Sequence, residues 1–360
     1  MKTEADIAAH LGVPHTIIYA QAYSTISSII PAFAKRGDII IADKCVNYAI
    51  RKGMQLSRST VKWFEHNDME DLERVLRAVV EREKGRPLTR RFIVTEAMFE
   101  NVGDLVALPT VIELKHRYKF RLILDESQSY GVLGRTGRGI TEHQNVDPNN
   151  VDMIVGSMAG PLCAGGGFCA GSDEVVEHQR LSAAAYTFSA ALPAMLATTA
   201  SETIRLLQEQ PEIITSSREN TKAMRAMLDP RSDWVRCTSA PENPLLILVL
   251  KDEVIKKKNL SRDDQEVILQ EIVDEVGLPA IHELGKRVDA YMMQCLANNV
   301  LITRLKSMPI MLGNSPKEDQ GWQPQPALKV GVTNGLTKKE TERAGTIIRH
   351  AITKVLTKRK

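Results

Sequence analysis

The residues that could do chemistry gather in two short segments. Asp125 and Glu126 end the apolar run "FRLILDES" at residues 120–127, and the small-residue turn "GSMAGPLCAGGGF" occupies residues 156–168. A carboxylate at the end of a buried strand can hold or transfer a proton, and a glycine-rich turn can leave room for a bound group. Residues 120–221 contain no lysine. The segments therefore offer acid–base chemistry and a hollow, but no amine for covalent catalysis.

Both segments also have a purely structural interpretation. The three glycines at residues 165–167 could form only a tight turn or a β-bulge. Asp125 could be a helix N-cap or a member of an ion pair. The residue types alone leave these alternatives open.

Three apolar, β-rich runs could position these segments, and they lie at residues 37–43, 90–97 and 120–127. Between them, residues 68–83 and 107–118 carry apolar side chains at helical spacing. This alternation predicts an α/β fold with a mostly parallel central sheet covered by helices. Ligands of such sheets bind beyond the carboxyl ends of the strands, so Asp125 and the glycine turn should face one crevice.

We expect two domains, a large α/β domain at residues 1–220 and a smaller α+β domain at residues 221–360. The second contains the strand-like runs "NPLLILVLKD" and "PALKVGV", and Thr337 and Glu340 follow in the capping-box spacing that opens a helix. Residues 306–326 are rich in proline, glycine and charge, which predicts an irregular insertion. The sequence shows no internal repeat.

The composition excludes several classes of function. The 47 basic and 44 acidic residues nearly balance and leave a net charge of +3, which gives no support for nucleic-acid binding. The five cysteines lack a C-x-x-C pair, which favours a reducing compartment and argues against a structural zinc site. Residues 16–34 and 181–201 are uncharged, but hydroxyl side chains and a proline interrupt each stretch, so neither should span a membrane. The first residues are charged and do not resemble a signal peptide.

A series of ordered blocks identifies a family resemblance. The blocks "LILDESQSYGVLGRTGRG", the glycine turn and "HQRLSAAAYTFSAALP" resemble the α-oxoamine synthases. These are fold-type-I acyltransferases that use pyridoxal phosphate to join an amino acid to an acyl-CoA thioester. The resemblance extends from about Glu4 to Leu356. It implies that family's fold and cofactor, although the glycine-rich N-terminal segment with which the family begins is missing here.

The resemblance implies roles for three residues around the cofactor ring. Asp125 stands where the family pairs a carboxylate with the protonated ring nitrogen. Gln128 replaces a family histidine beside the ring, and an amide cannot carry a proton on and off near neutral pH. Asn47 replaces a histidine that stacks on the ring. Two of the three positions have therefore lost their family chemistry.

Further positions concern the cofactor phosphate and the Schiff base. Tyr23 and Ser24 lie in the turn that holds the phosphate in the family, and Ser189 belongs to a block that reaches across a dimer towards the partner's phosphate. Gly160 occupies the place of the Schiff-base lysine. A lysine amine is needed for the covalent cofactor link and for proton transfer, so we expect no catalytic residue in this chain.

One branch of the family combines these losses, and it supplies the non-catalytic long-chain-base subunit of a eukaryotic condensing enzyme of sphingolipid synthesis. The resemblance implies a heterodimer in which a lysine-bearing catalytic subunit holds pyridoxal phosphate, with small regulatory membrane subunits as further partners. It implies the cytosolic face of the endoplasmic reticulum membrane, reached through the missing N-terminus or through partners.

Two other functions remain open at this point. The chain could be a self-sufficient homodimeric enzyme that uses a displaced lysine such as Lys222. It could also be a truncated regulatory relic that assembles no enzyme.

Overall fold

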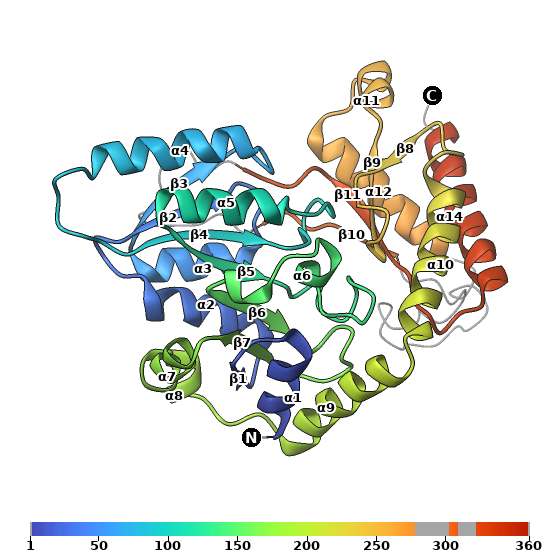
Figure 1. The fold of residues 1–360 in the computed structure, drawn as a ribbon. Helices are drawn as coiled ribbons and strands as arrows, with labels where there is room; N and C mark the ends of the chain where they lie inside the picture. The colour runs from blue at the N-terminus through green and yellow to red at the C-terminus, as the bar shows by residue number, and fades with distance from the viewer. Residues whose placement is uncertain (1, 278–301, 309–321, 359–360) are drawn as a thin grey trace. The chain divides into compact units, whose positions relative to one another are not determined.

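The computed structural model describes residues 2–277, 302–308 and 322–358, and its contacts divide the chain into two compact units. The first unit contains Met1–Glu100 and Leu105–Ile214 (Figure 1). The second contains Asn101–Asp104, Thr215–Met308 and Gln323–Lys360. The contact units change near residue 215, and the domain boundary that we expected near residue 220 stays a prediction. Residues 309–321 of the expected insertion lie outside the described residues.

A seven-stranded sheet forms the centre of the first unit, in the order β1-β7-β6-β5-β4-β2-β3. The strands are β1 (His15–Tyr19), β2 (Ile39–Asp43), β3 (Thr60–Phe64), β4 (Arg91–Glu96), β5 (Arg121–Asp125), β6 (Met153–Ser157) and β7 (Gly167–Gly171). Strands β3, β2, β4, β5 and β6 are parallel, whereas β7 is antiparallel to both β6 and β1. The sheet is therefore mostly parallel, and the predicted α/β fold class is confirmed.

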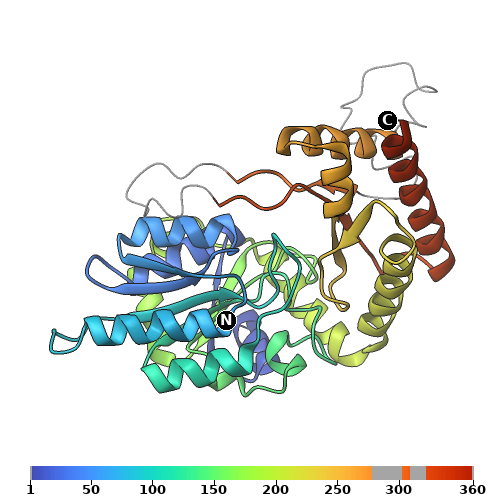
Figure 2. The ribbon, with the colours of Figure 1, turned by 90° about the horizontal axis from the view of Figure 1, so that it is seen from above.

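Helices cover both faces of this sheet. They are α1 (Lys2–Leu11), α2 (Ala22–Phe33), α3 (Tyr48–Ser57), α4 (Met69–Arg82), α5 (Leu108–Tyr118), α6 (Ile140–His143), η1 (Pro148–Asn150), α7 (Asp173–Ser182), α8 (Ala184–Thr187) and α9 (Ala194–Glu209). Figure 2 shows α2 and α3 on one face and α4 and α5 on the other. The strands between them are accordingly apolar on both faces, and all five residues of β2 are buried.

Local sequence explains where the helices near the candidate site begin. The Asp68 carboxylate accepts hydrogen bonds from the backbone N–H groups of Glu70 and Asp71, which caps α4. Pro109 occupies the first turn of α5, where its missing N–H costs nothing. Buried side chains such as Leu72 and Val111 then hold the two helices against the sheet, each contributing about 1.5–3 kcal/mol.

The second unit has an antiparallel sheet of four strands in the order β10-β11-β9-β8. The strands are β8 (Val235–Cys237), β9 (Leu245–Leu250), β10 (Ile302–Arg304) and β11 (Ala327–Gly331), and the helices are α10 (Glu212–Leu228), α11 (Asp252–Lys258), α12 (Arg262–Gly277) and α14 (Lys338–Lys358). The predicted capping box is confirmed, because Thr337 N donates to the Glu340 carboxylate at 2.8 Å and Glu340 N donates to Thr337 Oγ1 at 3.3 Å. No helix among the described residues is long and apolar enough to cross a membrane.

Candidate functional site

Three acidic residues end adjacent parallel strands of the first unit. Asp43 ends β2, Glu96 ends β4 and Asp125 ends β5, and each is at most 3% exposed. Glu96 and Asp125 are direct partners in the register of β4 and β5. Because all three strands are parallel, their carboxyl ends bring the three side chains to the same edge of the sheet. This edge is the candidate site that the sequence predicted.

Asn47 connects the acids of this edge. Its backbone N–H donates to Glu96 Oε1 at 2.6 Å, and its side-chain Nδ2 donates to Asp125 Oδ2 at 3.0 Å. Its Oδ1 accepts from the Ile50 N–H at 3.0 Å, so the residue also caps α3. Asn47 thus uses its donors and its acceptor within the protein, and its amide lies against the carboxylate of Asp125.

The second oxygen of Asp125 is also engaged, because Ser127 N donates to Asp125 Oδ1 at 2.9 Å. Burial raises the pKa of Asp125, and hydrogen bonds from Ser127 and Asn47 oppose that rise. Burial, together with the charge of Asp125, raises the pKa of Glu96 well above its ordinary value. Burial therefore disfavours the charged forms of Glu96 and Asp125, while the donated hydrogen bonds favour them.

This arrangement does not fit pyridoxal phosphate as the family holds it. A protonated ring nitrogen would need an oxygen of Asp125, and each of these oxygens accepts one hydrogen bond, from Asn47 Nδ2 or from Ser127 N, and keeps a second lone pair. Gly160 supplies no amine. Asp125 therefore retains an acceptor for a ring nitrogen, whereas the group that would bind the aldehyde is missing at Gly160.

Two glycines of the glycine turn lie tightly against this chain's own atoms, and the hollow expected there stays a prediction. A Cβ atom on Gly166, where φ is +83°, would lie 2.3 Å from the Tyr19 carbonyl oxygen. A Cβ atom on Gly167 would lie 2.5 Å from Thr25 Oγ1. These glycines permit close approach of backbone segments, which is the structural interpretation. Gly160 differs, because a Cβ atom there would meet nothing within 4 Å.

The predicted phosphate turn lies at the start of α2. Tyr23 is 52% exposed, and its ring stacks on that of Tyr48 with centroids 6.4 Å apart. Ser24 Oγ donates to the Gln21 carbonyl oxygen at 3.1 Å and remains half-buried. Both residues therefore have partners within the chain, and their role towards a phosphate stays a prediction.

Gln128 and Ser189 are not part of the network around Asn47. Gln128 is half-buried and follows the end of β5. Ser189 is exposed after α8, and its Oγ donates to the Ala185 carbonyl oxygen at 2.6 Å. Lys222, the displaced lysine that we considered, is exposed on α10.

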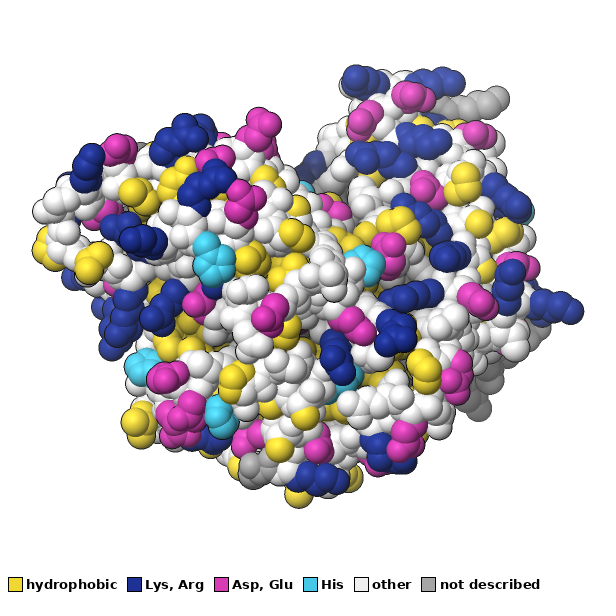
Figure 3. Space-filling view, in the orientation of Figure 1, with side chains coloured by type: hydrophobic (Ala, Val, Ile, Leu, Met, Phe, Trp, Pro, Cys, Tyr) yellow, Lys and Arg dark blue, Asp and Glu magenta, His cyan; other side chains and the backbone are white. Residues whose placement is uncertain are grey.

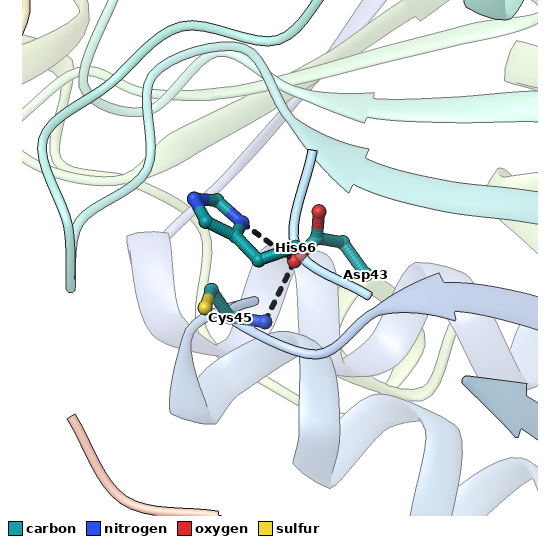
Figure 4. Close-up of side chains that lie close together, drawn as sticks. All are labelled: Asp43, Cys45 and His66. Carbon is teal, nitrogen blue, oxygen red and sulfur yellow. Dashed lines mark hydrogen bonds and ion pairs between the residues drawn. The ribbon is translucent and has the colours of Figure 1, made fainter. Parts of the chain in front are cut away.

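Sequence reasoning missed a cluster beside this edge that contains Asp43, Cys45 and His66 (Figure 4). Asp43 Oδ1 accepts from Cys45 N at 2.7 Å and from His66 Nδ1 at 2.9 Å, and Oδ2 accepts from Asn67 N at 2.8 Å. A metal ion would need the same carboxylate oxygens. These hydrogen bonds join the loops after β2 and β3. The sequence signal for them was the aspartate that ends "IIIAD".

Glu126 was also named from the sequence, and the structure gives it a structural role. Its carboxylate accepts from Ile140 N at 3.1 Å and from Ser129 Oγ, so it fastens the loop between β5 and α6. Burial raises its pKa to about 7. The side chain is fully buried and accepts hydrogen bonds from these donors, so it stabilises the loop between β5 and α6.

Comparison with known proteins adds to this geometry. The aminotransferase class I and II family profile matches residues 2–284. Serine palmitoyltransferase 1 of Dictyostelium discoideum is 36% identical over 356 residues, which are 98% of this chain and 68% of that protein. The chain therefore belongs to the aminotransferase class I and II family. Long chain base biosynthesis protein 1c of rice is 46% identical over 248 residues, 69% of this chain and 51% of that protein. Serine palmitoyltransferase 1 of Saccharomyces cerevisiae is 42% identical over 254 residues, 69% of this chain and 46% of that protein.

Solved structures agree on the fold. A serine palmitoyltransferase of S. paucimobilis, solved with a bound PLP–myriocin aldimine, has a TM-score of 0.75 and 20% identity over 99% of this chain and 76% of that one. An 8-amino-7-oxononanoate synthase of Francisella tularensis has a TM-score of 0.68 and 17% identity over 98% of this chain and 87% of that one. The chain therefore has the fold of these two enzymes, the first of which was solved with a pyridoxal phosphate aldimine.

Proposed function

We propose that this chain is a non-catalytic subunit of serine palmitoyltransferase. It would support the condensation of L-serine with palmitoyl-CoA to 3-ketosphinganine, while a lysine-bearing partner subunit holds pyridoxal phosphate. The observation that carries the proposal is the Asn47 amide seated on Asp125 in a chain that has Gly160 in place of the lysine. The relatives named serine palmitoyltransferase 1 support the choice of enzyme.

A surface for the partner subunit supports a heterodimer. Residues 181–196, which we call the apolar strip, carry three large hydrophobic side chains in open solvent. Leu181 is 83% exposed, Phe188 is 86% exposed and Met195 is 72% exposed. Covering such side chains stabilises a complex because each removes a large apolar area from water. Ser189 lies within the strip, where the resemblance expects a ligand for the partner's cofactor phosphate.

The strip can be tested by co-expression with a lysine-bearing relative. We expect Phe188→Ser with Met195→Ser to weaken association about 100-fold, because two large side chains lose about 3 kcal/mol of burial. Leu88→Ser is the matched control, since Leu88 is 95% exposed and lies outside the strip. Affinity is measured by titrating one purified subunit with the other. Equal weakening by both variants would contradict the strip as the partner surface.

The cofactor assignment has its own test. We expect borohydride reduction after incubation of the isolated chain with pyridoxal phosphate to give no pyridoxyl-lysine peptide by mass spectrometry. Stoichiometric labelling of one lysine, with condensation of serine and palmitoyl-CoA by the chain alone, would establish the homodimeric enzyme instead. A chain that copurifies with no lysine-bearing relative would be the relic. The proposal also places the complex at the cytosolic face of the endoplasmic reticulum membrane, with small regulatory membrane subunits as partners, which fractionation of native membranes would check.

A further inference from the structure

A cleft lies at the amino ends of strands β4 and β5, which we call the amino edge of the seven-stranded sheet. It has a volume of about 630 Å³, and its lining includes Arg91 and Arg121, the first residues of β4 and β5. The amino ends of these strands lie a full strand length from Glu96 and Asp125, at their carboxyl ends. The cleft is therefore separate from the candidate site described above.

The lining of this cleft is strongly cationic. Arg90, Arg91, Lys119 and Arg121 line it, whereas Glu174 is its one carboxylate. None of these four side chains forms an ion pair with a carboxylate of the described residues, although the Arg90 guanidinium donates to the Phe33 carbonyl oxygen at 2.7 Å. Other arginines of the first unit are paired in this way, for example Arg117 with Glu73 at 2.8 Å. Unpaired cations around a concave surface attract an anion.

Two polar atoms of the cleft have no partner. Thr89 Oγ1 and Arg91 Nε are both buried, and neither has a hydrogen-bond partner among the described residues. A buried donor without an acceptor costs about 1–3 kcal/mol, and more for a charged group. Thr89 and Arg91 are two residues apart, and both residues line the cleft. The missing partner leaves Arg91 without an internal acceptor at Nε, which adds to the positive charge beside the cleft.

The rim of the cleft adds an apolar element. Leu88 is 95% exposed and lines the cleft on the loop between α4 and β4, and Lys84 and Arg86 belong to the same loop. Figure 3 shows hydrophobic side chains beside Lys and Arg side chains at the left of the view, where Figure 1 places this loop. Lys84 and Arg86 pair with Glu81 and Glu83, so the cations that face the cleft beside Leu88 are those of its lining. An exposed leucine next to such cations suits an interface where phosphates lie next to acyl chains. A soluble phosphate ester would leave Leu88 in water.

We propose that this cleft binds the phosphate of an anionic membrane phospholipid, with Leu88 inserted among the acyl chains. The guanidinium groups of Arg90 and Arg91 hold the phosphate, and Lys119 and Arg121 attract the anionic surface. The binding is independent of the condensing activity and of the partner subunit. It gives the first unit a direct contact with a membrane through its own side chains.

The test measures partition of the purified chain between buffer and vesicles by flotation. Vesicles of phosphatidylcholine with phosphatidic acid should bind the chain, and vesicles of phosphatidylcholine alone should bind it at least tenfold more weakly. Lys119→Gln with Arg121→Gln should lower partition about 25-fold, because each cation near an anionic surface contributes about fivefold. Leu88→Ser should lower it about tenfold. Near-ultraviolet circular dichroism shows that each variant is folded.

Two controls separate this site from general attraction. Lys256→Gln with Lys257→Gln removes two exposed cations of α11 that do not line the cleft, and Phe188→Ser removes an exposed side chain of the apolar strip. Both should leave partition unchanged. Equal loss with the α11 variant would overturn the proposal, as would equal binding to both kinds of vesicle. Calorimetry with glycerol phosphate distinguishes a soluble ester, since tight binding unaffected by Leu88→Ser and without vesicle partition would also overturn it.

Discussion

The two edges of the seven-stranded sheet treat their charged residues in opposite ways. At the carboxyl edge, Asp43, Glu96 and Asp125 are buried, and each accepts hydrogen bonds from nearby loops or from Asn47. At the amino edge, Arg91 Nε finds no acceptor among the described residues, and the neighbouring cations have no carboxylate partner there. The carboxylates of the carboxyl edge thus accept hydrogen bonds from within the chain, whereas the cations of the amino edge lack carboxylate partners among the described residues.

This difference indicates where each edge still interacts with other molecules. A buried polar group without a partner costs stability, so internal hydrogen bonds at a buried site stabilise the fold. Asn47 provides such a bond to Asp125 at the carboxyl edge. The exposed cations of the amino edge have no carboxylate partner in the described structure, so stability depends less on them. We therefore expect substitutions to be costly for stability at the carboxyl edge and nearly neutral at the amino edge.

The largest expected effect concerns the glycine turn of the carboxyl edge. Gly166→Ala should lower the free energy of unfolding by about 3–5 kcal/mol, because the new Cβ atom would lie 2.3 Å from the Tyr19 carbonyl oxygen at a φ of +83°. Gly160→Ala is the matched control in the same turn and should change it by less than about 0.5 kcal/mol. Urea unfolding measures both. Equal effects would show that the turn is not packed.

Replacing Asn47, which donates a hydrogen bond to Asp125, should lower the free energy of unfolding nearly as much as Gly166→Ala does. Asn47→Asp keeps the cap of α3 but places a second carboxylate against Asp125, so we expect a loss of about 3 kcal/mol at pH 8. The loss should shrink at pH 5, because burial raises the pKa of Asp125 and a shared proton relieves the repulsion. Asn47→Ser, which keeps the cap and removes the donor to Asp125 without adding a charge, should show a smaller pH dependence of the same sign. A loss independent of pH in the aspartate variant would refute the contact.

The raised pKa of Glu126 predicts that the free energy of unfolding depends on pH. Burial raises its pKa from 4.5 to about 7, so the folded state holds a proton that the unfolded state has released between these values. The free energy of unfolding should therefore fall by about 2–3 kcal/mol as the pH rises from 4.5 to 7 and stay level above. Glu126→Gln should remove this part of the slope, and the exposed Glu81→Gln should retain it. Denaturant midpoints across this range provide the measurement.

The smallest effect is expected at the amino edge. Lys119→Gln with Arg121→Gln removes two exposed cations that have no carboxylate partner in the described structure, so repulsion from Arg90 and Arg91 decreases. We expect the free energy of unfolding to rise by at most about 0.5 kcal/mol, and less at high salt. A destabilisation above 1 kcal/mol would show that these cations already have structural partners, and the contrast between the edges would fail.

Much of the fold was predictable because its signals are local. The expected runs at residues 37–43, 90–97 and 120–127 contain β2, β4 and β5, and the helical patterns match α4 and α5. Strands β1 and β3 escaped notice, and both are outer strands of the sheet. Most residues of β3 are exposed or half-buried, so it lacks the continuous apolar run of β2. The antiparallel course of β7 also escaped notice, since strand direction depends on the connection and not on the residues of the strand.

The candidate site was predictable in its losses but not in its contacts. The missing lysine at Gly160 and the changed positions Asn47 and Gln128 follow from aligning the blocks of the sequence. The role of Gly166 and Gly167 could not be assigned from the sequence, because small residues serve equally to admit a ligand and to let backbones approach. Composition cannot separate these uses, since the difference lies in Tyr19 and Thr25 from other elements.

Sequence alone determined that residues 120–221 contain no amine for a cofactor and that strands alternate with helices in the first half of the chain. Tertiary structure decided that Asn47 bonds to Asp125, which lies 78 residues away, and that Arg91 and Arg121 meet beside Leu88. The physical reason is that covalent chemistry depends on which atoms exist, whereas the satisfaction of a charge depends on which distant groups the fold brings within hydrogen-bond reach.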